Sequence, residues 1–365
     1  MNSHLGQDSK TPLKVSLIST VLNEVELLDW WLESIKDQTR QPDEIVIVDA
    51  GSSDGTTEKL ASIEAAGELP VRVIVVPGAN ISKGRNVAIE AASYDIIAAT
   101  DAGTLLDKQW LERLVQPLED PSIDVSSGFY RPAGRNDFER MLASVIVPRL
   151  SEIDPETFLP SSRSVAFRRA AWRSAGGYPE WLLVVEDLVF DMELRDKGAR
   201  FVFTPAAIAS WYPRPTLKAF FKQYRNYSRG DGHARILGHR HVARYSAYMG
   251  GLCLLWIGRA ARWPWLALAL GGSGYMRKFV WRFWDERPFA TTPAMVLRTP
   301  FVVLIVVIGD LGKMLGYPQG RWERFRLGGP DGLEAAKIRS HRSMDELGEL
   351  DKRLPKEQEV AESST

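Results

Sequence analysis

The chain has 365 residues, of which 45% are hydrophobic and 25% charged, an ordinary composition for a folded protein with one large domain and an appendage. Its 46 basic and 46 acidic residues cancel, so no overall field favours nucleic acid as a partner. The one cysteine, Cys253, excludes an internal disulfide, and its apolar surroundings predict a buried position. Residues 1–12 are polar and lack the apolar segment of an export signal, so we expect the N-terminal half to work in the cytosol.

Strand and helix patterns alternate from residue 14 to residue 99. Predicted strands cover Val15–Ser19, Glu44–Val48, Val71–Val76 and Asp95–Ala99. Predicted helices cover Glu24–Gln38, Thr56–Ala66 and Ser82–Ala92, the last with Ser82 as its N-cap. Alternating units with continuously apolar strands predict an α/β fold whose sheet is mostly parallel and buried on both faces.

The pattern is less regular between residues 100 and 235. The expected strands are Val125–Tyr130, Val165–Phe167 and Arg200–Pro205, and the expected helices are Asp107–Pro117, Asp137–Leu150, Arg168–Ala175, Glu186–Lys197 and Thr216–Tyr227. Beyond residue 240, aromatic residues crowd around three apolar runs, Tyr245–Gly258, Trp263–Leu270 and Pro300–Gly309. We predict a disordered N-terminus (1–12), a catalytic domain (13–235), a helical membrane-associated region (236–325) and a charged, disordered tail (326–365).

The apolar runs are short for membrane spans, which need about 20 mostly apolar residues. Arg259 and Arg262 interrupt the first two runs, and eleven residues, 299–309, separate Arg298 from Asp310. Interfacial helices or a re-entrant hairpin therefore fit at least as well as a span. Core helices of a soluble bundle are the alternative.

Two of the predicted strands lead into aspartates. Asp49 closes the strand Glu44–Val48 and Asp101 follows Asp95–Ala99, at the sheet edge where open α/β folds bind ligands. Gly51 allows a tight turn, and Asp49 before it and Asp54 after it offer carboxylates to a ribose, a base or a metal. Turn or helix capping is the alternative for both. These strand ends indicate a site for a nucleotide and a metal.

Several motifs, in order, resemble the inverting family-two glycosyltransferases over about three-fifths of the chain, from Lys14 to Arg235. The matching segments are Ser19–Glu24 (STVLNE), Val48–Thr56 (VDAGSSDGT), Gly84–Ala88 (GRNVA), Asp101–Gly103 (DAG), Glu186-Asp187 and Gln223–Tyr227 (QYRNY). They correspond to the family's strand-end Asn-Glu, nucleoside-binding motif, helix start, D-x-D motif, catalytic acidic pair and Q-x-x-R-W motif.

The resemblance implies a Rossmann-like domain that transfers a sugar from a nucleotide-diphosphate donor to a hydroxyl. Asp187 is the expected general base, with Glu186 beside it, although first-turn acids also simply stabilise a helix. Arg85, at a helix start that favours phosphate, and Asp101 would face the diphosphate. The residues expected around the donor are Asn23, Glu24, Asp49, Gly51, Asp54, Arg85, Asp101, Arg225 and Arg229. A glycan or polyprenyl-linked lipid acceptor at the cytoplasmic face of a membrane is expected, and no nucleic acid.

Two positions depart from the family pattern, because Ala50 and Gly103 stand where members usually carry aspartates. A divalent cation, Mn²⁺ or Mg²⁺, is suspected at Asp101, but one carboxylate is a poor site. Either the diphosphate and waters complete the shell, or another side chain does, such as Asp107 or His233 in a predicted flexible turn, or the metal is dispensable. Without a metal, Arg225 and Arg229 would offset part of the charge of the diphosphate.

Two other functions remain open from the sequence. A sugar nucleotidyltransferase usually has a Gly-rich basic loop after the first strand, where this chain reads Val21–Glu24 (VLNE). The absence of aspartates at positions 50 and 103 would also fit a non-catalytic relative that binds a nucleotide sugar or a lipid.

Overall fold

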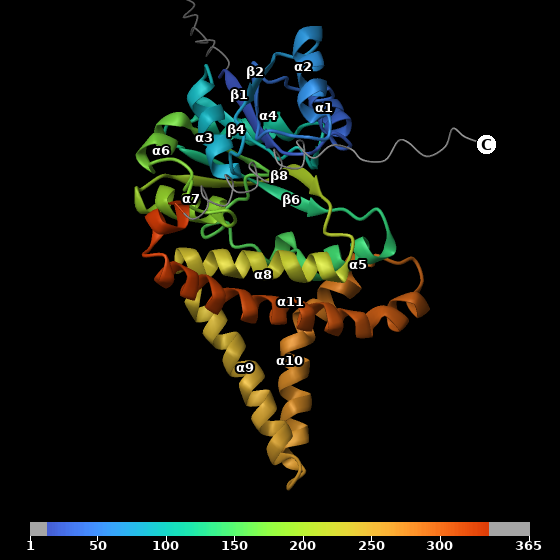
Figure 1. Ribbon diagram of the computed structural model, residues 1–365. Helices are drawn as coiled ribbons and strands as arrows, with labels where there is room; N and C mark the ends of the chain where they lie inside the picture. The colour runs from blue at the N-terminus through green and yellow to red at the C-terminus, as the bar shows by residue number, and fades with distance from the viewer. Residues whose placement is uncertain (1–12, 336–365) are drawn as a thin grey trace, which may run out of the picture.

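The computed structural model describes residues 13–335, which form an α/β body, a layer of two long helices and a projecting helical hairpin (Figure 1). The strands are β1 (Val15–Val21), β2 (Glu44–Asp49), β3 (Val71–Val75), β4 (Ile96–Ala99), β5 (Thr104–Leu106), β6 (Val125–Pro132), β7 (Val165–Arg168) and β8 (Phe201–Trp211). The body's helices are α1 (Leu28–Lys36), α2 (Thr56–Ala66), α3 (Ile81–Ala91), α4 (Trp110–Val115), α5 (Asp137–Ile146), α6 (Arg169–Ser174) and α7 (Glu186–Asp196). The remaining helices are α8 (Leu217–Ala234), α9 (Gly238–Ile257), α10 (Trp263–Glu286) and α11 (Thr292–Arg326).

All eight strands form one sheet in the order β3-β2-β1-β4-β7-β6-β8-β5. Strands β3, β2, β1 and β4 run parallel, and β6 pairs in parallel with β8. Strand β7 is antiparallel to both its neighbours, and β5, which the sequence did not predict, is antiparallel to β8. The α/β fold with a mostly parallel sheet is therefore confirmed, and a helical apolar region follows it.

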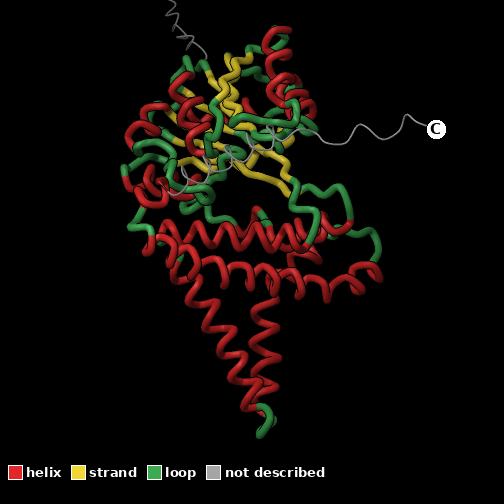
Figure 2. The backbone as a smooth tube through the Cα atoms, in the orientation of Figure 1, coloured by secondary structure: helices red, strands yellow, loops and turns green. Residues whose placement is uncertain are grey.

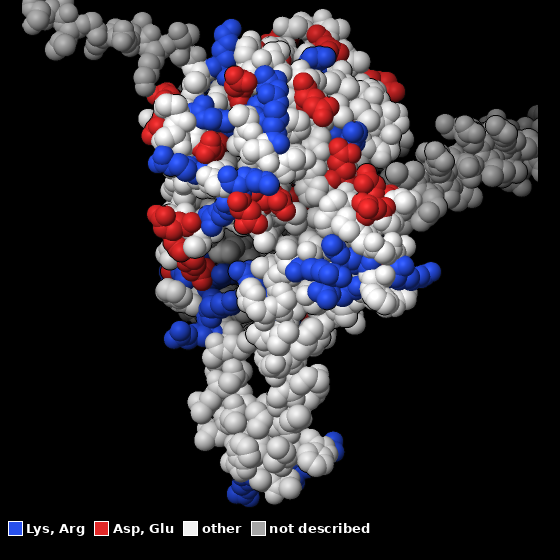
Figure 3. Space-filling model, turned by 90° about the vertical axis from the view of Figure 1, so that its left-hand side faces the viewer, with Lys and Arg blue, Asp and Glu red and all other residues white. Residues whose placement is uncertain are grey.

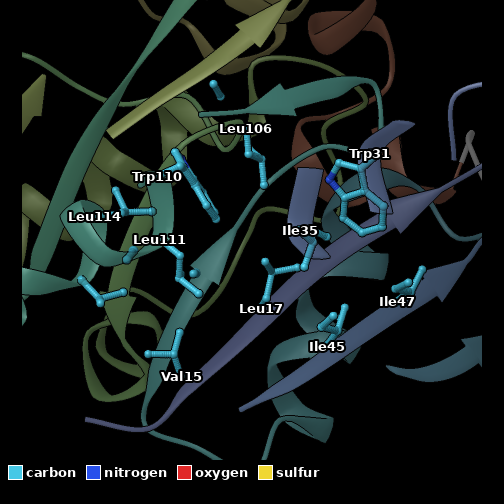
Figure 4. Packing of buried hydrophobic residues seen from close by; sticks show 14 of the residues in the cluster. Val15, Leu17, Trp31, Ile35, Ile45, Ile47, Leu106, Trp110, Leu111 and Leu114 are labelled. Carbon is cyan, nitrogen blue, oxygen red and sulfur yellow. The ribbon is translucent and has the colours of Figure 1, made fainter. Parts of the chain in front are cut away.

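The central strands are buried on both faces, as their continuous apolar runs predict. Leu17 and Ile47 point to one face, where Trp31 of α1 and Trp110 of α4 cover them (Figure 4). Alternate residues such as Val46 pack on the other face. This double layer holds the carboxyl ends of β1, β2 and β4 in fixed positions.

Three local predictions are wrong. Helix α3 begins at Ile81 with Asn80 as its N-cap, because the Asn80 side chain accepts a hydrogen bond from the Lys83 amide at 2.9 Å. His233 lies in α8 and not in a flexible turn, because its Nε2 bonds the Glu323 carboxylate of α11 at 2.8 Å. Cys253 is exposed, because it lies near the end of α9, in the hairpin that projects away from the body.

Helices α8 and α11 lie side by side beneath the body (Figures 1 and 2). Glycines allow their backbones to touch: a Cβ at Gly316 would lie 2.1 Å from the Arg225 carbonyl oxygen, and one at Gly320 would lie 2.0 Å from that of Arg229. Helices α9 and α10 form a hairpin that leaves this layer at a steep angle (Figure 1).

The predicted ends of the chain are only partly within the described residues. Residues 330–335 form a helical segment at the start of the predicted tail. Residues 1–12 and 336–365, which include the rest of both segments predicted to be disordered, lie outside the described residues.

Candidate active site

A cavity of about 750 Å³ lies where β1, β2 and β4 end. Thr20, Val21 and Ala50 line it at the strand ends, while Trp211 at the end of β8 and the tyrosines of α8 close the opposite wall. Five of the predicted site residues also line it, namely Glu24, Arg85, Asp101, Glu186 and Asp187. This is the crevice in which open α/β sheets bind ligands.

Arg85 joins two of the predicted acids. Its Nη1 donates to Glu186 at 2.8 Å and its Nη2 donates to Asp101 at 2.9 Å, and the arginine is 3% exposed. The arginine lies on α3, next to Gly84. This glycine lets the helix approach β1 closely, since a Cβ at Gly84 would lie 2.6 Å from the Thr20 side chain. Burial works against the charged form of Arg85, but the two carboxylates outweigh it and raise the pKa of the guanidinium. A buried cation thus ties the end of β4 to the start of α7.

Asp101 has a second basic neighbour that the sequence did not predict. The Nε of Arg163, in the loop before β7, lies 3.6 Å from Asp101 Oδ2. Burial alone would raise the pKa of Asp101, but Arg85 and Arg163 outweigh it and hold the pKa below its usual value. Asp101 is therefore ionised and has an arginine on each oxygen.

The two predicted catalytic acids have different surroundings. Glu186 is buried against Arg85, and burial together with the charge of Asp187 raises the pKa of Glu186 to about 7. Asp187 is half-buried and, among the described residues, makes no ion pair; its Oδ1 accepts the Leu188 amide at 2.8 Å. One acid of the pair is thus held by a cation, and its neighbour is available to a ligand.

The backbone directly before this pair is strained. Val185 has φ of 59°, in the left-handed region that a β-branched residue rarely adopts. Gly230 of α8 packs on it, because a Cβ at that glycine would lie 2.8 Å from Val185 Cγ2. Such strain costs on the order of 1–3 kcal/mol and persists where surrounding packing imposes it. Here it sets the start of α7, and hence the positions of Glu186 and Asp187.

Four predicted donor residues build the turns beside the cavity without lining it. Asp49 is fully buried, and its Oδ1 accepts the amides of Gly51 and Ser52 at 3.1 and 3.0 Å. Gly51 has φ of 91°, which suits only glycine in this turn. Asp54 Oδ1 accepts the Thr56 amide at 3.0 Å. The fourth, Asn23, accepts the Ser53 amide at 2.8 Å and so joins the turns that follow β1 and β2.

The two arginines predicted to face the diphosphate do not line the cavity. Arg225 donates from Nη2 to Gln319 at 2.7 Å, and Arg229 donates from Nε to Glu323 at 2.6 Å. Both partners lie on α11. The close packing of α8 on α11 therefore directs these guanidinium groups into the helix pair and away from the site.

The residues present are a poor donor set for a divalent cation. No group of three or more His, Cys, Asp or Glu side chains able to hold a metal occurs among residues 13–335. Asp101 has arginines on both oxygens, Gly103 offers no side chain, and neither Asp107 nor His233 lines the cavity. Mg²⁺ is usually held by one or two carboxylates together with waters and substrate phosphates, so a site here would depend on Asp101, which is already paired with two arginines. Glu24, whose pKa is raised by burial and by the charge of Asp101, adds one carboxylate at most.

The sequence also missed an aromatic wall. The guanidinium of Arg163 lies over the Trp211 ring at 5.2 Å, and the rings of Trp211 and Tyr130 meet edge to face at 6.4 Å. Tyr224 and Tyr227 of α8 line the same cavity. No periodic pattern marks Arg163, which lies among serines in a loop. The signal available in the sequence was a lone arginine two residues before a short apolar strand.

The comparisons with protein families identify this chain as a glycosyltransferase. The chain belongs to glycosyl transferase family 2: the family model described as "Glycosyl transferase family 2" matches residues 16–175, and the one described as "Glycosyl transferase family group 2" matches residues 96–307. The family resemblance inferred from the motifs is therefore confirmed.

Curated relatives and a solved structure agree with this assignment. The chain is 23% identical over 331 residues to the O-antigen chain rhamnosyltransferase RfbN of Salmonella typhimurium, covering 86% of this chain and 92% of the relative. It is 24% identical over 320 residues to the succinoglycan biosynthesis protein ExoA of Rhizobium meliloti, covering 80% and 94%. A mannosyltransferase from Pyrobaculum calidifontis, solved with GDP-Man and Mn²⁺, shares the fold with a TM-score of 0.51 and 17% identity over 86% of this chain and 87% of that one.

Proposed function

We propose that this glycosyltransferase moves a sugar, with inversion, from a nucleotide-diphosphate donor to a hydroxyl of a glycan or polyprenyl-linked lipid in envelope glycan synthesis. The observation that carries the proposal is the difference between the two acids of the pair: Arg85 holds Glu186, while Asp187 lines the cavity and forms no ion pair with any residue from 13 to 335. The relatives named for O-antigen chain and succinoglycan synthesis support the acceptor class.

In the proposed reaction the nucleoside lies against Val21, Ala50 and Glu24, in the crevice that the turns built by Asn23, Asp49, Gly51 and Asp54 shape. The acceptor oxygen attacks the anomeric carbon from the side opposite the diphosphate. As that bond forms, Asp187 takes the hydroxyl proton, and the bond to the diphosphate breaks with its electron pair on the leaving oxygen. Attack from the opposite side inverts the configuration.

A panel of donors tests this function. We expect detergent-extracted protein with a crude lipid extract to release nucleoside diphosphate from one of UDP-, GDP- or dTDP-sugars. The product linked to the acceptor should have the opposite anomeric configuration, as NMR of the glycan reports. Absence of release from every donor would favour a non-catalytic relative, and retained configuration would contradict direct attack assisted by Asp187.

We further propose that the hairpin of α9 and α10 inserts into a lipid bilayer. Its middle is apolar, and Figure 3 shows no Lys, Arg, Asp or Glu on the visible face of the stalk between the body and the tip. Large side chains stand exposed there, such as Leu252 (57%), Trp256 (71%) and Leu270 (66%). An exposed apolar surface of this size favours contact with a membrane or a partner.

Arginines at both ends of the hairpin favour the bilayer over a protein partner. Arg259 and Arg262 lie at the tip, fifteen residues from Arg244 and Arg277 near the base, or about 22 Å of helix. The hydrocarbon core is about 30 Å thick, and long basic side chains extend to the headgroups on either side.

Helix α11 is the one helix within residues 13–335 whose length and hydropathy alone suit a span, and one-third of its most apolar window is buried. Because it packs along α8, we propose instead that it lies along the membrane surface. Six of its exposed apolar residues share one face, at intervals of three, four or seven: Leu297, Phe301, Leu304, Leu311, Leu315 and Trp322.

The distribution of basic residues supports the cytoplasmic face for the catalytic body. Arg259 and Arg262 are the two basic residues at the tip, whereas a larger group flanks the base: Arg235, Arg240, Arg277, Lys278 and Arg287. Segments rich in Lys and Arg beside a membrane segment stay in the cytoplasm.

The triple variant Leu252→Asp, Leu266→Asp, Leu270→Asp should lose membrane attachment. Each aspartate placed in the bilayer core costs about 3 kcal/mol more than leucine. We expect most of the protein to move from the carbonate-washed membrane fraction to the soluble fraction. A control with three aspartates on the exposed face of α2, at Ala61, Ser62 and Ala65, should stay with the membrane. Equal membrane retention of the two variants would contradict hairpin insertion.

A further inference from the structure

We propose that Arg163 binds the donor's diphosphate in place of a divalent cation, so that donor binding by this chain needs no metal. This inference rests on the proposed function and assigns the charge partner of its leaving group. It starts from the disagreement between the metal that the family suggests and the side chains present around Asp101.

Asp101 is already neutralised by protein groups. Arg85 Nη2 donates to one oxygen at 2.9 Å, and Arg163 Nε lies 3.6 Å from the other. Both guanidinium groups would repel a cation placed on this carboxylate, and Arg85 cannot easily move away, because its side chain is only 4% exposed and is held by Glu186 as well.

Arg163 is fixed in the cavity and retains unused donors. Its Nη1 donates to Ser161 at 2.9 Å and its plane lies over Trp211 at 5.2 Å. No described residue accepts a hydrogen bond from its Nη2 group, while the residue lines the cavity. A planar guanidinium with free N–H groups matches phosphate oxygens, and the aromatic contact fixes its orientation before the ligand arrives.

The charges of the cavity lead to the same conclusion. Four acidic residues line it, Glu24, Asp101, Glu186 and Asp187, beside the two arginines, for a formal charge of −2. With aspartates at positions 50 and 103, as in the family pattern, the charge would be −4, and one divalent cation would return it to −2. Loss of those two carboxylates thus removes the charge that a cation would offset.

Nucleoside diphosphate binding tests this separately from catalysis. UDP, GDP and dTDP are titrated into the detergent-solubilised full chain with EDTA, and again with Mn²⁺ or Mg²⁺. We expect one of them to bind with a Kd that changes less than about twofold between these conditions. Arg163→Met should weaken that binding by about tenfold or more, and Arg163→Lys, which keeps charge without the fork, should lie between. Arg200→Met, at an exposed position before β8, is the matched control and should bind normally.

A second variant, designed to gain metal dependence, gives a result that misfolding alone could not produce. A Cβ at Gly103 would meet only Leu27 Cδ1, at 3.9 Å, so Gly103→Asp fits the fold and restores the second carboxylate. We expect its diphosphate binding to weaken in EDTA and to recover with Mn²⁺.

The outcomes separate the two proposals. Wild-type binding that disappears in EDTA and returns with Mn²⁺, or binding that is unchanged in Arg163→Met, would overturn the arginine assignment and leave the transferase intact. Failure of all three nucleotides to bind under any condition would overturn the proposed donor class, and this inference with it.

Discussion

Asp187→Asn is expected to lower the rate of sugar transfer by a factor of about 10²–10⁴, the usual contribution of a positioned general base. The amide keeps the size of the side chain and its hydrogen bond from the Leu188 amide, but it cannot take the acceptor proton. Because Asp187 makes no ion pair among the described residues, the variant should fold normally and bind nucleoside diphosphate with unchanged affinity. The measurement is initial-rate release from the donor identified by the panel.

The matched control is Glu193→Gln, which removes a carboxylate from the exposed side of the same helix. It should transfer sugar at the wild-type rate. If Asp187→Asn also keeps the wild-type rate, Asp187 is not the base, whereas a parallel loss of donor binding would place it in binding and not in proton transfer.

Arg85→Met is expected to reduce the free energy of unfolding by about 3–5 kcal/mol, the usual cost of removing one partner from a buried ion pair. The variant leaves Glu186 without its cation and leaves one oxygen of Asp101 unpaired. For a body of this size the midpoint of thermal unfolding should fall by roughly 6–20 °C. Thermal melts of the detergent-solubilised protein measure this shift.

The double variant Arg85→Met, Glu186→Gln isolates the ion pair. Removing the orphaned charge should recover part of the lost stability, since residues in direct contact do not act additively. Arg173→Met, at an exposed position on α6, controls for the substitution itself and should melt with the wild type. A fall in midpoint that is equal for Arg85→Met and Arg173→Met would show that the buried network contributes no stability.

Many elements of the catalytic body could be predicted because their signals are local. Helix α2 occupies Thr56–Ala66, as predicted, since Gly55 and Gly67 bound it in the left-handed conformation that glycine adopts most easily. The parallel strands followed from apolar runs that only burial on both faces explains. Strand β5 was missed because three residues carry too little pattern to distinguish them from a loop.

Part of the site could likewise be predicted. Asp101 and the pair Glu186-Asp187 stand directly at element boundaries, where strand and helix ends bring side chains to one edge. The positions of these motifs along the chain therefore predict which edge of the sheet carries the site. Asp49 was located at the same edge, but whether its carboxylate faces a ligand or its own turn depended on backbone geometry that the sequence does not specify.

The sequence by itself determined seven of the eight described strands, most of the helices and the family, because these depend on periodicity and on short motifs. Only the tertiary structure decided which charges meet. Arg85 reaches Glu186 across 101 residues, and Arg225 is turned toward α11 by a helix contact 94 residues away. Arg163 reaches Asp101 only because β7 pairs with β4 and carries the loop before it to the end of that strand. Such long-range contacts depend on the packing of whole elements, and no local pattern encodes them.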